Sequence, residues 1–280
     1  MRFDIVHQTD YHYSSPVFLE PQLLRLRPRT DWSQRLAAYD LEISPRPAGR
    51  AKLVDLDGND TVQLWFSDTH DHLRITARST VETLREDPFA YLLDTEADRL
   101  PPPYAEQSAQ LQVYQTHDTD PAVQELTRAV QREAGDLTVH FLSLLNQRIK
   151  QICPTETRLE GDPLTPAQTL ARGGGACRDV AILFMASCRS LGLAARFTSG
   201  YVEGSLQQER FLHAWAEIYL PGAGWCGYDP SLGLVVADRH VALASGPTAA
   251  ATRPFSGRFR GDNTQAAMTV DLQIHTTPST

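Results

Sequence analysis

One cysteine of the chain stands between a glycine run and a segment with helical periodicity. The run covers residues 173–175 and is followed by Ala176 and Cys177. From 180 to 191 apolar residues recur at helical spacing, and Gly192 ends the pattern. The pattern predicts that Cys177 lies in the first turn of a helix, where unpaired N–H groups and the positive end of the helix dipole favour an anion. We expect the pKa of this thiol to be lowered toward a reactive thiolate.

Two later residues could complete a nucleophilic site with Cys177. A cysteine nucleophile needs a base within hydrogen-bond reach, and that base needs a third group to fix its ring. His213 lies in the alternating segment 211–219, on the face opposite its small apolar residues. Asp229 ends the next strand-like segment. The sequence therefore offers Cys177, His213 and Asp229 as a candidate catalytic triad.

The spacing of His213 and Asp229 fits the geometry of a hairpin. The loop 220–224 joins their two segments. If its turn is centred near 221–222, residues whose numbers add to about 443 face each other, and His213 faces a position near about 230. Asp229 falls within about two residues of that position. The register therefore predicts an imidazole and a carboxylate side by side on neighbouring strands.

Each of these residues also has an ordinary structural interpretation. A cysteine at a helix start is often a buried small hydrophobic residue, and a single strand histidine is more often structural. Asp229 precedes Pro and Ser, which together form a turn signal. The combined spacing favours the catalytic interpretation. The other cysteines fit it less well, because Cys188 lies in the apolar helix, Cys226 has no helix start of its own and Cys153 precedes a proline.

Two further patterns could bind ligands, but both signals are weak. Asp68, His70 and His72 alternate as they would along one strand face, yet a complete ligand set with a second shell is not evident, so a solvated edge is favoured. The glycine run lacks the Lys-Ser/Thr that follows a phosphate-binding loop. We expect neither a metal nor a bound cofactor.

The overall composition argues against several classes of partner. The 280 residues carry a net charge of −8 with a pI ≈ 5.6, and the densest basic stretch, 25–29, is short. These features argue against nucleic acids and anionic membranes. No window approaches the roughly 20 apolar residues of a membrane span, and the chain begins with a strand-like run in place of a signal segment. We expect a cytoplasmic protein whose four cysteines form no disulfide framework.

The chain divides into three parts by composition and periodicity. Residues 1–93 show short alternating segments and a hairpin signal at 57–59, which predict an antiparallel β-sandwich of about six to eight strands. Residues 94–120 are acidic and proline-rich, as in a linker or surface-wrapping connection. Residues 121–280 begin with helical windows and continue with strands, which predicts an α+β catalytic domain. The strands are expected at 195–202, 211–220, 224–228, 241–244 and near 268–274.

Four segments of the second half occur in an order that is typical of a known family: Thr169–Asp179, Leu191–Tyr201, His213–Tyr219 and Gly224–Pro230. They resemble the bacterial transglutaminase-like (cysteine protease) superfamily. The segments His7–Tyr13 and Leu24–Arg29 resemble the β-rich N-terminal domain often fused to that core, and Arg239–Ala244 and Phe255–Gly261 resemble its C-terminal strands. The resemblance covers nearly the whole chain.

The resemblance implies a papain-like core, with helices packed on an antiparallel sheet. In such a core Cys177 attacks an amide carbonyl, His213 transfers the proton and Asp229 orients His213. The acyl-thioester then passes to water, as in a peptidase or amidase, or to an amine, as in a transglutaminase. Arg178 stands where many relatives carry Gln, and Ser231 stands where Thr is common, but neither departure removes a member of the triad.

We expect a peptide or protein amide as the substrate, with hydrolysis favoured over crosslinking. Water is always present, whereas transamidation needs an amine site that shields the thioester from it, and the sequence shows no such site. The backbone N–H of Cys177 is expected to form part of the oxyanion hole. The alternatives are protein-glutamine transamidation and a non-catalytic binding or scaffold protein that kept the core.

Overall fold

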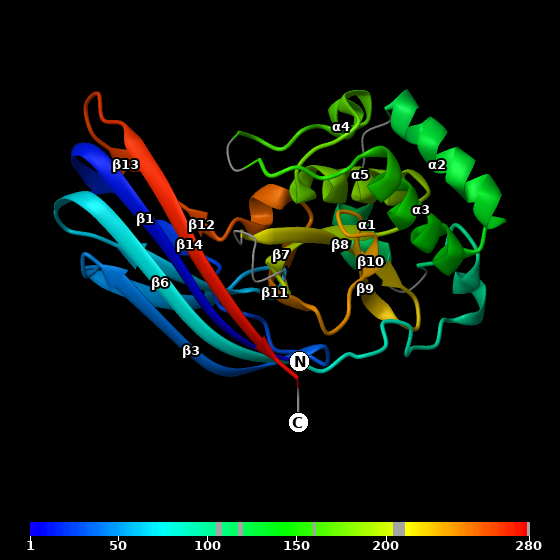
Figure 1. Ribbon diagram of the computed structural model, residues 1–280, viewed down its shortest axis with the longest axis horizontal. Helices are drawn as coiled ribbons and strands as arrows, with labels where there is room; N and C mark the ends of the chain where they lie inside the picture. The colour runs from blue at the N-terminus through cyan, green and yellow to red at the C-terminus, as the bar shows by residue number, and fades with distance from the viewer. Residues whose placement is uncertain (105–107, 117–119, 159–160, 204–210, 279–280) are drawn as a thin grey trace.

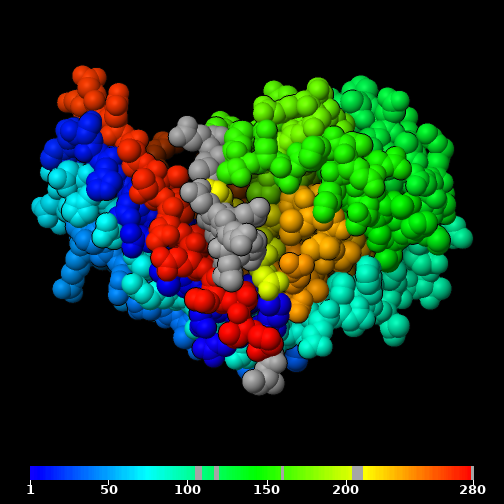
Figure 2. Space-filling view, viewed as in Figure 1, coloured from blue at the N-terminus to red at the C-terminus, as the bar shows by residue number. Residues whose placement is uncertain are grey.

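The computed structural model describes residues 1–280 except 105–107, 117–119, 159–160, 204–210 and 279–280. Figure 1 shows two parts side by side, one built of long strands and one in which helices cover a shorter sheet. In the space-filling view the N- and C-terminal strands, blue and red, form one side of the molecule and the helices, green, the other (Figure 2). The predicted α+β fold, a β-sandwich followed by helices on an antiparallel sheet, is confirmed.

The first part is a sandwich of two antiparallel sheets. One sheet has the order β13-β1-β6-β3, with β14 also paired to β1, and the other has the order β12-β2-β5-β4. Alternate residues of β1 and β6, such as Phe3, Ile5, Leu73 and Ile75, are buried and meet apolar residues of the second sheet in one core. The strands are β1 (Arg2–Leu19), β2 (Gln22–Leu24), β3 (Gln34–Ser44), β4 (Gly49–Val54), β5 (Asp60–Trp65), β6 (Thr69–Thr83), β12 (Phe255–Ser256), β13 (Phe259–Arg260) and β14 (Ala266–Thr277).

The last strands of the chain belong to this first sandwich. β14 runs antiparallel to β1 from Arg2 opposite Thr277 to Tyr13 opposite Ala266, and β12 pairs with β2. The sequence patterns grouped these strands with the catalytic domain at 121–280. The C-terminal strands therefore pair with the N-terminal part and not with the sheet of the second part. The domain boundaries 1–93, 94–120 and 121–280 stay a prediction.

The second part packs helices on one face of a five-stranded antiparallel sheet, β10-β9-β8-β7-β11 (Figure 1). Its strands are β7 (Ala195–Val202), β8 (His213–Leu220), β9 (Gly224–Asp229), β10 (Leu234–Val235) and β11 (His240–Gly246). Its helices are α2 (Pro121–Ala134), α3 (Thr138–Ile152), α4 (Pro166–Arg172) and α5 (Cys177–Ser190). Apolar residues of α2, α3 and α5 and of β8 form one buried core. The buried helix α5 therefore lies directly against the strand that begins with His213.

The other face of this sheet packs against the N-terminal sandwich. Tyr201 of β7 and Val241 and Leu243 of β11 are buried in the same core as the strands β1 and β6. The sheet that carries the candidate residues is thus covered on both sides, by helices on one and by the sandwich on the other.

The described residues of the segment 94–120 form two short helical elements. They are the 3₁₀ turn η1 (Thr95–Asp98) and the helix α1 (Ser108–Gln115), and a second 3₁₀ turn, η2 (Ala249–Thr252), follows β11. Tyr104 and Leu111 are buried against Ala194, next to the start of β7. Among the described residues no helix is both long and apolar enough to cross a membrane.

Candidate active site

Cys177 is the first residue of α5, as the sequence predicts. Gly173 adopts a φ of 65° and ends α4, which lets the chain turn sharply before the next helix. A side chain at Gly175 would approach the carboxylate of Asp179 to 2.9 Å, so this position needs glycine. The glycine run thus serves to place the start of α5, and Cys177 is partly exposed there.

Asp179 fixes the segment that enters α5. Its carboxylate is fully buried and accepts hydrogen bonds from the backbone N–H groups of Ala176 and Leu164, both at 2.8 Å. It also accepts two hydrogen bonds from Arg158, at 2.9 and 2.8 Å. Arg178 donates to the backbone carbonyl of Arg158 at 2.6 Å, so it holds the same loop from the other side. These bonds tie the start of α5, and with it Cys177, to Arg158 and Leu164.

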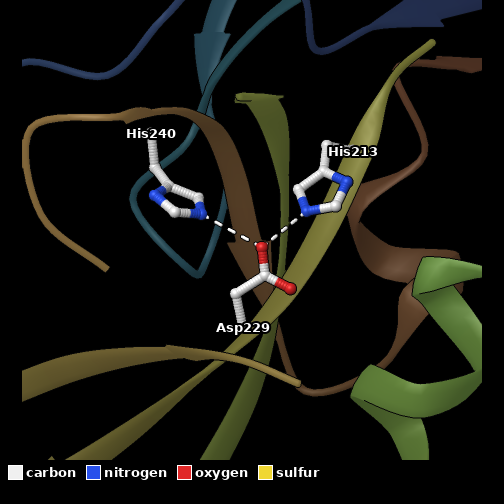
Figure 3. Close-up of side chains that lie close together, drawn as sticks. All are labelled: His213, Asp229 and His240. Carbon is white, nitrogen blue, oxygen red and sulfur yellow. Dashed lines mark hydrogen bonds and ion pairs between the residues drawn. The ribbon is translucent and has the colours of Figure 1, made fainter. Parts of the chain in front are cut away.

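The imidazole of His213 meets the carboxylate of Asp229 at the ends of two neighbouring strands. His213 begins β8 and Asp229 ends β9, and the distance from Nε2 to Oδ2 is 2.7 Å (Figure 3). Ala216 faces Tyr228 and Leu220 faces Gly224. The predicted register was wrong by one residue because the turn is centred on Gly222, whose φ is 87°. The side-by-side placement of the two groups is nevertheless observed.

The charges of the pair stabilise each other. Burial lowers the pKa of His213, but the Asp229 carboxylate and a hydrogen bond with Cys177 outweigh burial and raise it to about 10. Burial likewise raises the pKa of Asp229, yet His213 and then His240 hold it well below its usual range. The pair is therefore an imidazolium and a carboxylate at neutral pH.

The thiol of Cys177 lies close enough to His213 to contribute to the raised pKa of the imidazole. Because Nε2 of the imidazole is bonded to Asp229, Nδ1 is the nitrogen left for the thiol. In Figure 3 this second nitrogen points away from the carboxylate. The structure thus brings together all three residues that the sequence singled out.

Two polar residues that the sequence did not single out for chemistry also bind Asp229. The hydroxyl of Ser231 donates to Oδ1 at 2.6 Å, and the backbone N–H groups of Ser231 and Leu232 reach the same oxygen at 3.0 and 3.3 Å. Nε2 of His240, at the start of β11, lies 3.1 Å from Oδ2. His240 gave no signal because its contact joins β11 to β9, which are not neighbours in the sheet, and does not follow from local spacing.

His213, Asp229 and His240 are also the group that could hold a metal ion among the described residues, with their ligand atoms within 4.8 Å of one another. A ligating histidine normally donates its second N–H to a neighbouring acceptor. Nδ1 of His240 is buried and has no partner in the described part of the chain, so this arrangement suits a hydrogen-bonded group better than a metal centre.

The sequence pattern that could have formed a metal site does not do so among the described residues, since no such group includes Asp68, His70 or His72. The ring of His70 packs edge-on against Phe66, and Nδ1 of His72 bonds to Asp71.

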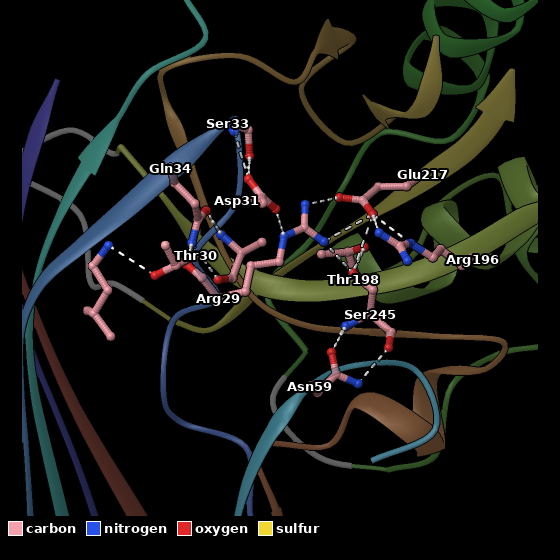
Figure 4. Close-up of polar contacts among 12 residues, drawn as sticks. Arg29, Thr30, Asp31, Ser33, Gln34, Asn59, Arg196, Thr198, Glu217 and Ser245 are labelled. Atoms are coloured by element: carbon pink, nitrogen blue, oxygen red, sulfur yellow. Dashed lines mark hydrogen bonds and ion pairs between the residues drawn. The ribbon is translucent and has the colours of Figure 1, made fainter. Parts of the chain in front are cut away.

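A buried ion-pair network lies on the same strand as His213. Glu217 is 3% exposed and sits between Arg29 of the N-terminal part and Arg196 of β7 (Figure 4). Arg29 donates to both carboxylate oxygens at 2.7 and 3.2 Å, and Nε of Arg196 donates at 2.7 Å. Burial raises the pKa of Glu217, but the two guanidinium groups outweigh burial and keep it well below its usual range. The network connects the N-terminal part to β8, the strand that begins with His213.

Comparisons with known proteins agree with this architecture. Residues 3–82 match the model of the bacterial transglutaminase-like N-terminal region, and residues 122–230 match the model of the transglutaminase-like superfamily. An uncharacterized protein of Mycobacterium tuberculosis is 27% identical over 294 residues, which cover 98% of this chain and 92% of that protein. An uncharacterized protein of Mycobacterium leprae is 24% identical over 290 residues, 99% and 98% of the two chains.

One solved structure shares the whole fold. It is named as a "Putative Cysteine Protease" from Cytophaga hutchinsonii and superposes with a TM-score of 0.74 at 20% sequence identity. The match covers 100% of this chain and 92% of that chain. The sandwich and the helix-covered sheet therefore occur together in that protein as well.

Proposed function

We propose that this chain, which belongs to the transglutaminase-like superfamily, is an enzyme that transfers the acyl group of an amide through a thioester on Cys177. The observation that carries the proposal is the position of His213, bonded at 2.7 Å to Asp229 and close to the Cys177 thiol. A nucleophile, a base and a group that orients the base are the parts such chemistry needs.

The first half of the proposed reaction forms a thioester on Cys177 and releases an amine. The proton of the Cys177 thiol resides on the His213 imidazolium, and the thiolate sulfur bonds to the amide carbonyl carbon. The backbone N–H of Cys177, at the positive end of α5, stabilises the oxyanion. The C–N bond breaks, and the amine leaves with the proton that His213 returns. Asp229 stays ionised throughout and holds the imidazole.

Water is the proposed acceptor of the acyl group. Attack by water on the thioester releases a carboxylic acid and restores the thiol, whereas attack by an amine would release a crosslinked amide. We favour hydrolysis of a peptide, isopeptide or related amide because water reaches any site that is not built to exclude it. The four free cysteines support a reducing, cytoplasmic setting.

The pH dependence of alkylation tests the activated thiol. Iodoacetamide should modify Cys177 alone, because Cys153, Cys188 and Cys226 are buried and burial raises the pKa of each. An ordinary thiol loses about 80-fold in alkylation rate between pH 8 and pH 6, as its thiolate fraction falls. The alkylation rate of Cys177, which is paired with the His213 imidazolium, should change by less than about threefold over the same pH range.

The variant His213→Ala provides the matched test. It should restore the ordinary pH dependence of alkylation at Cys177 while leaving the protein folded, and Cys177→Ala should remove the labelling. A wild-type rate that falls like that of an ordinary thiol would refute the activated nucleophile. Mass spectrometry of acyl adducts trapped from lysate on the wild type, with Cys177→Ala as control, then identifies the acyl donor. Adducts on neither protein would favour a scaffold that kept the core.

A further inference from the structure

His240 shares the carboxylate oxygen that binds His213. Nε2 of His240 lies 3.1 Å from Oδ2 of Asp229, and Nε2 of His213 lies 2.7 Å from the same atom (Figure 3). His240 is 4% exposed, so the bond lies away from bulk solvent. We propose that His240 is a positioning residue that donates a hydrogen bond to Asp229 and thereby limits how strongly the carboxylate holds the His213 proton. This inference rests on the proposed role of His213 as acid and base.

The protonation of His240 follows from its surroundings. The Asp229 carboxylate is ionised and can only accept hydrogen bonds, so Nε2 of His240 must carry the hydrogen. Nδ1 of His240 is buried and has no partner in the described part of the chain. A second N–H at Nδ1 would be a buried donor without an acceptor, which is costly. His240 is therefore a neutral imidazole with its hydrogen on Nε2.

The ring is held in the orientation that this donation needs. The indole of Trp215 contacts it edge-on, with ring centroids 5.2 Å apart and an interplanar angle of 72°. Trp215 lies two residues from His213 on the same face of β8, and its side chain is 1% exposed. In the described part of the chain, the titratable groups that face His240 are Asp229 of β9 and His213 of β8.

The hydrogen bond from His240 to Oδ2 affects the step in which His213 gives its proton to the leaving amine. Ser231 and Leu232 already saturate Oδ1, so Oδ2 is the atom through which Asp229 acts on His213. A donor at Oδ2 draws part of its negative charge, and a carboxylate with less charge stabilises the neighbouring imidazolium less. His213 must give its proton to the leaving amine, and an imidazolium that is held too strongly is a poor acid. His240 therefore favours proton release.

The test measures the His213 imidazole directly. In protein labelled with ¹⁵N at its histidines, NMR follows the titration of His213 in the wild type, His240→Phe and His240→Gln. Phe keeps the ring volume against Trp215 and removes the donor, and the titration midpoint of His213 should rise by about one pH unit. Gln keeps an N–H donor, so its midpoint should stay near the wild-type value.

A matched control separates this effect from loss of packing. His7 is also a buried histidine, 3% exposed and bonded to the hydroxyl of Tyr201 at 2.9 Å, but it lies in the N-terminal core. His7→Phe should lower stability without moving the midpoint of His213. A midpoint unchanged in His240→Phe would overturn the proposal.

A measurement on the wild type keeps the proposal testable if His240→Phe does not fold. The ¹⁵N shifts of His240 at neutral pH should show hydrogen on Nε2 and none on Nδ1. A charged ring, or hydrogen on Nδ1, would overturn the proposal. Failure of the proposed function is a different outcome, because it would appear as ordinary alkylation of Cys177 in the wild type, whatever residue 240 is.

Discussion

Arg29→Met tests whether the N-terminal sandwich supports the catalytic strand. The substitution keeps the apolar stem of Arg29 and removes the guanidinium group that bonds both oxygens of Glu217. Removing one partner of a buried ion pair typically costs about 3–5 kcal/mol, because the other charge stays buried. Arg196 still binds Glu217 at 2.7 Å, so we expect the lower end, a loss of about 3 kcal/mol in the free energy of unfolding.

Urea unfolding followed by circular dichroism measures this loss, and two further variants sharpen it. Arg35→Met removes an ion pair with Glu82 in which Arg35 is 63% exposed, so it should cost less than about 1 kcal/mol. Glu217→Gln combined with Arg29→Met removes both charges, so the double variant should lose clearly less than the sum of the single losses. A loss in Arg29→Met no larger than in Arg35→Met would refute the reasoning. The rate of Cys177 alkylation in each variant shows whether the effect reaches the site.

Three further predictions concern the site and its support. Asp179→Asn removes the buried charge at the entry to α5, so we expect about 2–3 kcal/mol lower stability in urea and slower alkylation of Cys177; an unchanged rate would contradict its positioning role. Gly200→Ala would overlap the carbonyl of the neighbouring strand and an indole ring, so it should cost about 1–3 kcal/mol, and a neutral effect in urea unfolding would count against this tight packing. The pKa of His213 is raised from 6.5 to about 10, so its bond to Asp229 contributes stability that is complete below pH 6.5 and is lost as pH rises toward 10. The difference in Tm between wild type and His213→Ala should therefore shrink from pH 7 to pH 10, and a constant difference would contradict this linkage.

The parts of the site that the sequence predicted depend on short-range signals. The start of α5 follows from a glycine run and an apolar period, and α2 begins at Pro121, where the helical windows of the second half were expected, with Asp120 accepting from the N–H of Ala122 at 2.9 Å. The pairing of His213 with Asp229 follows from one short hairpin. Its register was wrong by one residue, since the centre of the turn depends on the backbone angles of Gly222 and not on residue types alone.

The parts that the sequence did not predict depend on contacts between distant segments. His240 contacts Asp229 although β8 and β7 lie between β11 and β9 in the strand order, so no local spacing in the sequence indicates the contact. β14 pairs with β1, at the other end of the chain, along twelve residues from Ala266 to Thr277. A period-two pattern predicts such strands but does not say which strand lies beside them.

These distant contacts make the N-terminal sandwich part of the support of the site. The side chain of Gln34 bonds both the N–H and the carbonyl of Ala242, at 2.7 and 3.0 Å, and the side chain of Asn59 bonds both backbone groups of Ser245 at 2.8 Å. Both partners lie on β11, the strand that begins with His240. A chain that lacks residues 1–93 would lose the two side-chain amides that bind β11 and the Arg29 guanidinium that binds Glu217. The N-terminal sandwich therefore supports the proposed triad through β8 and β11. Substitutions in the sandwich should change the alkylation rate of Cys177 although the substituted residues do not contact Cys177.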